Sequence, residues 1–178
     1  MIASDRTQNI IVGGMIIVAL VSSGFLVGNS MYYSGSYALA AGLQVTMNDP
    51  VVSNIDVGNE SVSPVVSISF QLQARSPFEG DVRITFMGAQ VTLNGDVLSY
   101  TPFAWVVPFN EQPVDPDYNR TVAFTRNTGD DRPTIIDAYN SGLWNWTVVF
   151  RYSFIVFNEP GSISWTYRDF NTTSVVIA

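Results

Sequence analysis

The sequence contains no cysteine and no histidine, and its eight basic residues are all arginine. Without cysteine the chain can form neither disulfide bonds nor thiolate metal sites. Without histidine it lacks the side chain best suited to acid–base catalysis near neutral pH, and with it the Ser–His and Cys–His nucleophilic pairs. The net charge of −7 repels nucleic-acid phosphates. We therefore expect a protein that is not an enzyme and binds no nucleic acid, with a carboxylate- or calcium-dependent enzyme as the catalytic alternative.

Charged residues are also absent from residues 10–28, which are mostly apolar. A helix that crosses the hydrocarbon core of a bilayer needs roughly 20 such residues, whereas the apolar part of a secretory signal has about 7 to 15. The pattern predicts a transmembrane helix over residues 10–28, preceded by a cytoplasmic stub over residues 1–9. One alternative is a signal peptide cleaved at Ala38-Leu39-Ala40, although these small residues lie far beyond the apolar run. A pilin-type signal would need a basic and a small residue where Thr7-Gln8-Asn9 stand.

The arginines predict the orientation of this helix. Arg6 precedes it and no basic residue follows until Arg75, so the positive-inside rule places the N-terminus in the cytoplasm and the C-terminal domain outside the cell membrane. Tyr32 and Tyr33 suit the headgroup layer of the lipid bilayer. Residues 24 and 28 form a GxxxG spacing that lets two helices approach closely, with a lone anchor as the alternative.

Beyond the helix, residues 29–42 are expected to form a stalk or a continuation of the helix, and the period of the sequence changes from residue 43 onward. Residues 66–73 alternate apolar and polar side chains, which is typical of a strand with one buried face. In residues 82–87 the same alternation places Phe86 on the buried face and Met87 on the outer face. The longest alternation covers residues 144–157, and its predicted buried face consists of Trp144, Trp146, Val148, Phe150, Tyr152, Phe154 and Val156.

Turn signals separate these segments. Asn94-Gly95 accepts the positive φ angles of a tight hairpin, and residues 158–161 are expected to turn the chain towards its last strands. Residues 120–125 predict one more strand, and residues 133–140 a short helix. Many short strands between turns predict a mainly β chain, in which an N-terminal transmembrane helix is followed by an antiparallel, immunoglobulin-like β-sandwich over residues 43–178.

The run LQVTMNDPVVSNIDVGNESVSPVVSISFQLQARSPFEGDVRITFMGAQVTLNGDVLSYTPF, residues 43–103, resembles in its layout the type-2 late-embryogenesis-abundant (water-stress and hypersensitive-response) domain, in a membrane-anchored, archaeal-type form. Where that family has Asn-Pro at the end of its long strand, Arg75-Ser76-Pro77 keeps only the proline. The resemblance implies a seven-stranded, immunoglobulin-like sandwich without established catalytic residues. The single-anchor plan is also similar in architecture to the archaellum stator proteins, whose outward sandwich engages the surface layer.

An acidic segment suggests a metal ion. Asp115, Asp117 and Asn119 occupy alternating positions, as do the first three oxygen ligands of a calcium loop. Arg120 stands where that loop needs glycine and Arg126 where it needs glutamate, so the alternative is a solvated loop. Residues 130–131, both aspartate, are further oxygen donors from a neighbouring loop. Calcium is the one cofactor that the sequence suggests.

Four segments match the Asn-x-Ser/Thr acceptor of N-linked glycans, and in an outward-facing domain each can be modified. They begin at Asn59, Asn119, Asn145 and Asn171.

Apolar side chains exceed what a core needs in two places, the proline-bounded residues 102–109 and the outer face of the last long strand. Prolines at 102 and 108 lack the amide hydrogen that a strand donates, so the segment is expected at a sheet edge. A contact surface for a partner is the functional interpretation, and a segment that simply covers one sheet is the alternative. The predicted contact residues are Phe103, Trp105, Phe109, Ile155 and Phe157.

Two functional hypotheses follow. The first is a single-pass, membrane-anchored, extracytoplasmic binding or structural module of a cell envelope. The second is an accessory subunit of an integral membrane or cell-surface complex, including a role like that of the archaellum stator. Both predict the lipid bilayer and a second protein as partners.

Overall fold

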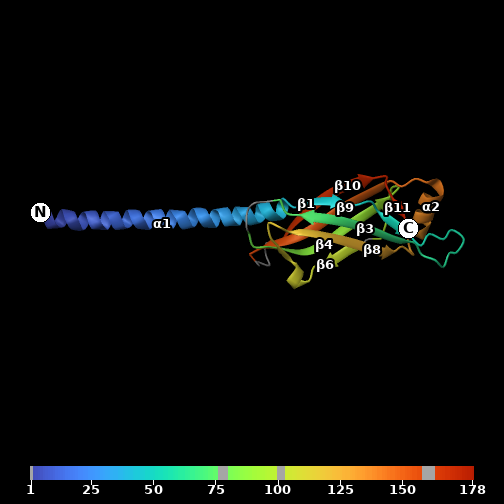
Figure 1. Ribbon diagram of the computed structural model, residues 1–178, viewed down its shortest axis with the longest axis horizontal. Helices are drawn as coiled ribbons and strands as arrows, with labels where there is room; N and C mark the ends of the chain where they lie inside the picture. Colours follow the sequence, from blue (N-terminus) through green and yellow to red (C-terminus); the bar gives the residue numbers. More distant parts are fainter. Residues whose placement is uncertain (1, 76–79, 100–102, 158–162) are drawn as a thin grey trace.

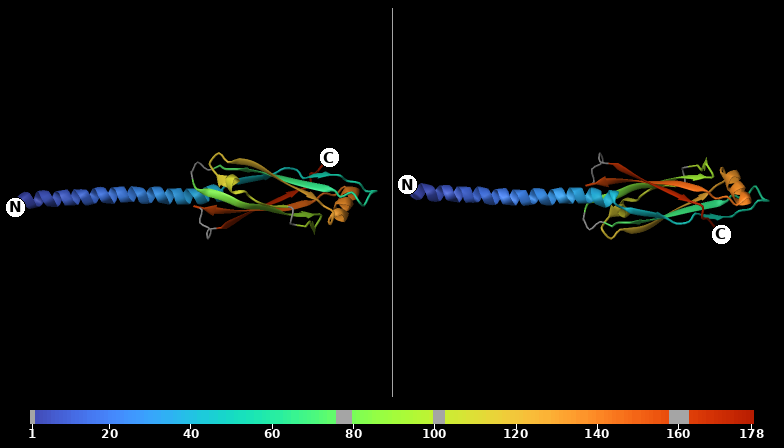
Figure 2. Two further views of the ribbon diagram at one scale, coloured as in Figure 1. Left: turned by 90° about the horizontal axis from the view of Figure 1, so that it is seen from below. Right: turned by 90° about the horizontal axis from the view of Figure 1, so that it is seen from above.

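The computed structural model describes residues 2–75, 80–99, 103–157 and 163–178. The described chain is mainly β, with one long N-terminal helix, α1 (Ile2–Ala41), that projects from a two-layered β domain (Figures 1 and 2). The other elements are β1 (Gln44–Met47), β2 (Val51–Ser53), β3 (Val65–Gln73), β4 (Val82–Leu93), β5 (Asp96–Val97), β6 (Ala104–Val106), the 3₁₀ turn η2 (Phe109–Glu111), β7 (Pro113–Val114), β8 (Asn119–Asn127), α2 (Arg132–Ser141), β9 (Trp146–Val156), β10 (Ser164–Thr172) and β11 (Val176–Ile177).

The strands form two sheets. In the first, β3 pairs with β8 on one edge and with both β1 and β2 on the other, and β11 extends β2 in parallel. In the second, β9 lies between β10 and β4, and β4 also pairs with β5, β6 and β7. The inner faces share one core, since the rings of Phe70 on β3 and Phe150 on β9 lie 4.4 Å apart. All described pairs are antiparallel except β2 with β11.

The alternation in the longest strand is confirmed. Every second side chain of the 144–156 run is buried, from Trp144, which is 9% exposed, to Val156, which is 1% exposed. The period of two puts these side chains on one face, and burying them between the sheets is the main favourable term in the folding of the domain. The alternation over residues 66–73 is confirmed in the same way in β3.

The prediction for β4 is wrong at one point. The pairing of β4 with β9 shifts register between Ile84 and Phe86, as a β-bulge does. One extra residue reverses the faces of the strand that follows. Met87 is therefore fully buried, and Phe86 lies on the outer face of the sheet, the opposite of what a simple alternation predicts.

The turn and helix signals are confirmed where the structure describes them. Asn94 and Gly95 have φ angles of 53° and 96° and join β4 to β5. Helix α2 ends at Gly142, whose φ of 68° closes the last turn in the left-handed region. Strands β8, β10 and β11 lie where strands are expected, and the predicted turn at residues 158–161 lies outside the described residues.

Helix α1 is longer than the predicted membrane span. It continues without a break through residues 29–41, so the predicted stalk is helical. At 1.5 Å per residue its 40 residues extend about 60 Å. Its apolar portion is long enough to cross a membrane, and no residue of the most apolar stretch is buried by the rest of the chain.

Candidate functional site

The junction between α1 and the β domain is built into the core. Ser36, Leu39 and Ala40 on the last turns of the helix are completely buried, and so is Leu43 just beyond it. The helix therefore enters between the sheets instead of ending at their surface, as Figure 2 shows. Sequence reasoning missed this contact because small residues such as serine and alanine carry no pattern of burial in a helix that is otherwise apolar all round.

Side chains of the β domain donate hydrogen bonds to the last carbonyl groups of this helix. The Tyr152 hydroxyl donates to the Ala40 carbonyl at 2.8 Å, and the Arg168 guanidinium donates to the Ala41 carbonyl at 3.0 Å. These carbonyls belong to the last turn, which has no partners within the helix itself. Burial raises the pKa of Tyr152, because the phenolate loses hydration between the sheets.

Close packing and aromatic contacts complete the junction. The Asp81 amide donates to Ser36 Oγ at 3.2 Å, and a Cβ atom on Gly80 would lie only 2.6 Å from Ser36 Cα, so glycine is required there. The Phe157 ring lies 4.2 Å from that of Tyr33 and 5.4 Å from that of Tyr32. The helix and the domain thus contact each other from Tyr32 to Leu43.

The five predicted contact residues do not form one surface. Phe103 is completely buried, so its assignment to a contact surface is wrong: the ring packs in the core and lies 5.9 Å from the Arg126 guanidinium. Phe157 contacts the helix instead of a free surface. Phe109 is 69% exposed, and Arg83, which stacks 4.4 Å over its ring, pairs with Ile155 on β9. Phe109 and Ile155 therefore flank Arg83 on the outer side of the second sheet.

Trp105 lies beside a groove between the two sheets. The groove has a volume of about 350 Å³ and is lined by Ala104 and Trp105 on β6 and by residues 120–125 on β8. The Arg120 Cζ atom lies 4.6 Å from the centre of the Trp105 ring, a cation–π contact, and its guanidinium pairs with Glu111. Trp105 is half-buried against the core and leaves part of its ring towards the groove.

The β8 side of this groove is an open strand edge. Among the described residues β8 pairs with β3 alone. The Thr128 amide donates to Pro64 and the Ala74 amide to the Tyr118 carbonyl, each at 2.8 Å. Antiparallel pairs exchange hydrogen bonds at every second residue, so the backbone groups of Thr121, Ala123 and Thr125 point away from β3. The alternation within β8 itself was visible in the sequence, but its position at an edge was not.

A second aromatic cluster lies on the outer face of the second sheet. The rings of Phe86 and Trp165 are 5.7 Å apart, and the Arg151 Cζ atom lies 5.7 Å and 5.5 Å from their centres. Tyr167, 55% exposed, and Arg151 also line a groove of about 390 Å³. Sequence reasoning missed this cluster because the bulge in β4 is what turns Phe86 outward.

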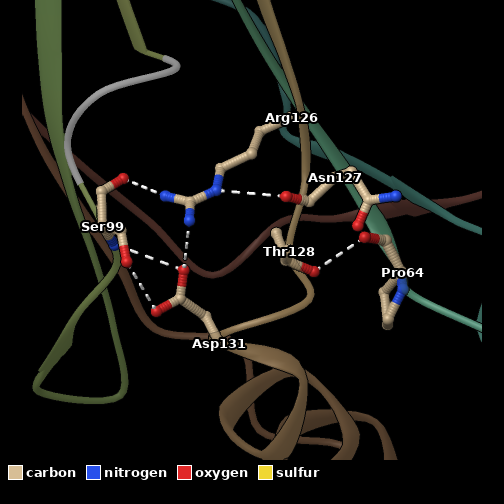
Figure 3. Close-up of polar contacts among 6 residues, drawn as sticks. All are labelled: Pro64, Ser99, Arg126, Asn127, Thr128 and Asp131. Carbon is tan, nitrogen blue, oxygen red and sulfur yellow. Dashed lines mark hydrogen bonds and ion pairs between the residues drawn. The ribbon is translucent and has the colours of Figure 1, made fainter. Parts of the chain in front are cut away.

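A polar clasp closes the end of the domain that carries α2 (Figure 3). The Arg126 Nη2 atom lies 3.3 Å from Asp131 Oδ2, and its guanidinium also donates to the carbonyls of Ser99 and Asn127. Asp131 in turn accepts hydrogen bonds from the amide and the hydroxyl of Ser99. The Thr128 hydroxyl donates to the Pro64 carbonyl at 2.7 Å. The clasp connects β8, the segment after β5 and the start of α2.

The predicted calcium loop is not assembled by the described residues, which contain no group of three or more acidic side chains that could hold a metal ion. Asp115 and Asp117 are exposed in the turn before β8, and the Asn119 Oδ1 atom accepts a hydrogen bond from Gln71 at 3.3 Å. Asp131, a further predicted oxygen donor, is paired with Arg126. We propose no role for calcium.

The four asparagines of the predicted glycosylation sites are all exposed. Asn145 and Asn171 lie close together, because their segments pair across β9 and β10 and the Thr147 hydroxyl donates to Asn171 Oδ1 at 3.0 Å. Exposure makes a side chain accessible, and modification of these sites stays a prediction.

No protein-family model and no curated protein matches the chain. Several solved structures resemble it. A protein from Archaeoglobus fulgidus is 12% identical, with a TM-score of 0.44, over 74% of this chain and 94% of that one. A protein from Arabidopsis thaliana is 10% identical, with a TM-score of 0.41, over 74% and 82%. The PapD-like domain of human CEP192 is 11% identical, with a TM-score of 0.34, over 74% and 85%. These likenesses identify no family for the chain.

Proposed function

We propose that the protein is a single-pass, membrane-anchored module of the cell envelope, with its N-terminus in the cytoplasm and an immunoglobulin-like β-sandwich outside, and that this domain binds another protein. The observation that carries the proposal is the junction: the apolar helix is exposed along its length and then enters the core of the domain. A helix with about 20 exposed apolar residues is stable in lipid and unstable in water. The proposed role is not catalytic.

The spacing along α1 supports this placement. The apolar run ends at Gly28, and Tyr33, five residues or about 7.5 Å further along the helix, already contacts Phe157 of the domain. The headgroup layer is about 5 to 7 Å thick on each side of the hydrocarbon core. The base of the domain then lies against the headgroups, where tyrosine rings are favoured.

Cysteine labelling tests the orientation, and the chain suits it because it contains no cysteine of its own. Gln8→Cys marks the segment before the apolar run, and Thr173→Cys marks the domain at an exposed position. We expect a membrane-impermeant maleimide to label Thr173→Cys on intact cells and Gln8→Cys only after permeabilisation. The unsubstituted chain is the control for labelling without cysteine.

Three outcomes would contradict the anchor. Labelling in the opposite order would reverse the topology. An intact mass that starts near Ala41 would show that the helix is a cleaved signal. Release of the full-length chain from membranes by alkaline carbonate would show that the helix is not embedded in the bilayer.

The second function that we propose is an accessory subunit of a larger membrane or cell-surface complex, an architectural analogy to the archaellum stator. The observations that favour it are the half-buried Trp105 ring beside its groove and, separately, the exposed Phe109 ring on the outer side of the second sheet. Mild detergent extraction separates the two roles. A chain that migrates alone supports the first, and one that stays in a large assembly supports the second.

A further inference from the structure

The edges of the two sheets differ in how they are protected from pairing with another strand. Natural edges are blunted by being short, by charged side chains, by proline or by bulges. The described edge strands β1, β5, β6, β7 and β11 have two to four residues each. β10 has nine residues but carries Arg168 and Asp169 near its middle.

β8 has none of these protections in its central part. It is nine residues long, and its pairing with β3 is continuous, without a register shift. Between Arg120 and Arg126 it carries neither charge nor proline, and its exposed side chains there are Thr121, Ala123 and Thr125. Both arginines point inward and are paired, with Glu111 and Asp131 respectively.

The open edge faces a groove and not a flat surface. Side chains of an added strand would alternate between solvent and the space between the sheets, where Trp105 and the inward residues Val122 and Phe124 lie. The backbone of β8 supplies hydrogen bonds along its length, and the groove accepts the inward side chains of the added strand. This combination is that of peptide recognition by strand addition.

We propose that β8 binds an extended segment of a partner protein as an added strand, with alternate apolar side chains of that segment against Trp105. The inference deepens the proposed binding function and rests on it for its biological setting. A second copy of this chain does not fit as the occupant. β8 runs along the direction of α1 (Figure 1), so an antiparallel β8–β8 pair would point the two helices in opposite directions, which one membrane does not allow.

The test uses the full chain in detergent and a fluorescent peptide of about nine residues, the length of β8, in which valine alternates with threonine between terminal lysines. Amide hydrogen exchange is followed residue by residue by NMR. We expect the amides of Thr121, Ala123 and Thr125 to exchange freely without peptide and about tenfold more slowly with it. A peptide with proline at every second position is the control, because it cannot extend a sheet.

Substitutions on the edge give a second readout. Ala123→Pro removes one outward amide without touching a hydrogen bond to β3, and should weaken peptide binding about tenfold. Ala123→Val keeps the amide and should bind within about twofold of the parent chain. Thr121→Pro, with Thr121→Val as its control, serves if Ala123→Pro does not fold.

Several results would overturn the proposal: no binding of the alternating peptide, binding without slower exchange at the three amides, or equal binding by the proline variants. A dimer with protected β8 amides in the absence of peptide would identify a second copy as the occupant and would equally overturn it. Peptide binding is measured in detergent, so its failure leaves the membrane labelling unaffected, and a reversed topology leaves peptide binding unaffected.

Discussion

Removing the negative charge from the polar clasp should be among the most destabilising single changes in the domain. The side chains of Arg126 and Asp131 are 6% and 13% exposed, so the guanidinium is held away from water and depends on its partners. Asp131→Asn preserves the shape of the side chain, but it removes the charge and one of the two oxygens that accept hydrogen bonds from Ser99 and Arg126. Breaking a buried ion pair in this way typically costs about 3 to 5 kcal/mol. We expect about 3 kcal/mol, since Asp131 keeps some contact with water.

The expected loss of stability comes from the buried Arg126 charge that is left without its partner, and not from a lost helix cap. Asp131 precedes α2, but its carboxylate makes no capping hydrogen bond to the helix. Replacing both partners, with Arg126→Met and Asp131→Leu, removes the buried charges together and should cost about 1 kcal/mol or less. The double variant is therefore expected to be more stable than Asp131→Asn alone, the coupling expected of two residues in one network of ion pairs and hydrogen bonds.

Thermal unfolding of the full chain in detergent, followed by near-ultraviolet circular dichroism, measures these differences. A loss of about 3 kcal/mol corresponds to a fall in melting temperature on the order of 10 °C. Glu111→Gln is the matched control: its pair with Arg120 is 39% and 25% exposed, so its loss should cost under about 1 kcal/mol. The reasoning is refuted if Asp131→Asn melts within 1 or 2 °C of the parent chain, about 0.5 kcal/mol, or if the double variant is the less stable of the two.

Two further predictions concern the junction and the tryptophans. Tyr152→Phe removes the hydrogen bond to Ala40 and should cost about 1 kcal/mol near neutral pH. Burial raises the pKa of Tyr152 in the folded state, so the stability that this group contributes is fully present below pH 10 and is lost as the pH rises above that value. In alkaline buffer the melting temperature of the parent chain should therefore fall more steeply with pH than that of the variant. Trp146→Ala should cost about 3 to 5 kcal/mol of stability, because the ring is 1% exposed. Trp105→Ala should cost less stability than Trp146→Ala and should act mainly by weakening association with a partner. Equal losses of stability in the two variants would contradict this distinction.

Elements with a strong local period were predictable from the sequence. In β9 every second residue is apolar over the whole strand, so no other register buries as much surface, and Asn94-Gly95 is favoured by the local φ angles alone. A local pattern cannot predict the bulge between Ile84 and Phe86. A residue of β4 counts as extra only relative to the residues of β9 with which β4 pairs.

The candidate site was less predictable, because its parts come together through pairing over long distances in the chain. Trp105 was singled out as an edge residue, but the groove also needs β8 to be the outer strand of the other sheet, and no residue of β8 shows that. Phe103 was assigned to the same surface because it lies in the same proline-bounded segment as Trp105, two residues before it in the sequence. In the structure Phe103 is buried in the core, with the Arg126 guanidinium near its ring. This contact joins distant parts of the sequence, so no local pattern predicts it.

The junction and the open edge together determine how the proposed partner would have to approach. Gln73 of β3 pairs with Gln44 on one side and Asn119 on the other, so the Asn119 end of β8 lies level with the end of α1. If the chain is anchored as we propose, the contacts at the junction place β8 roughly along the membrane normal, with this end nearest the bilayer. A strand added to β8 must then also run along the normal. An extended segment next to the membrane anchor of a neighbouring protein meets that condition, whereas a segment lying flat on the membrane does not. The geometry therefore favours a partner held in the same membrane, beside the open edge.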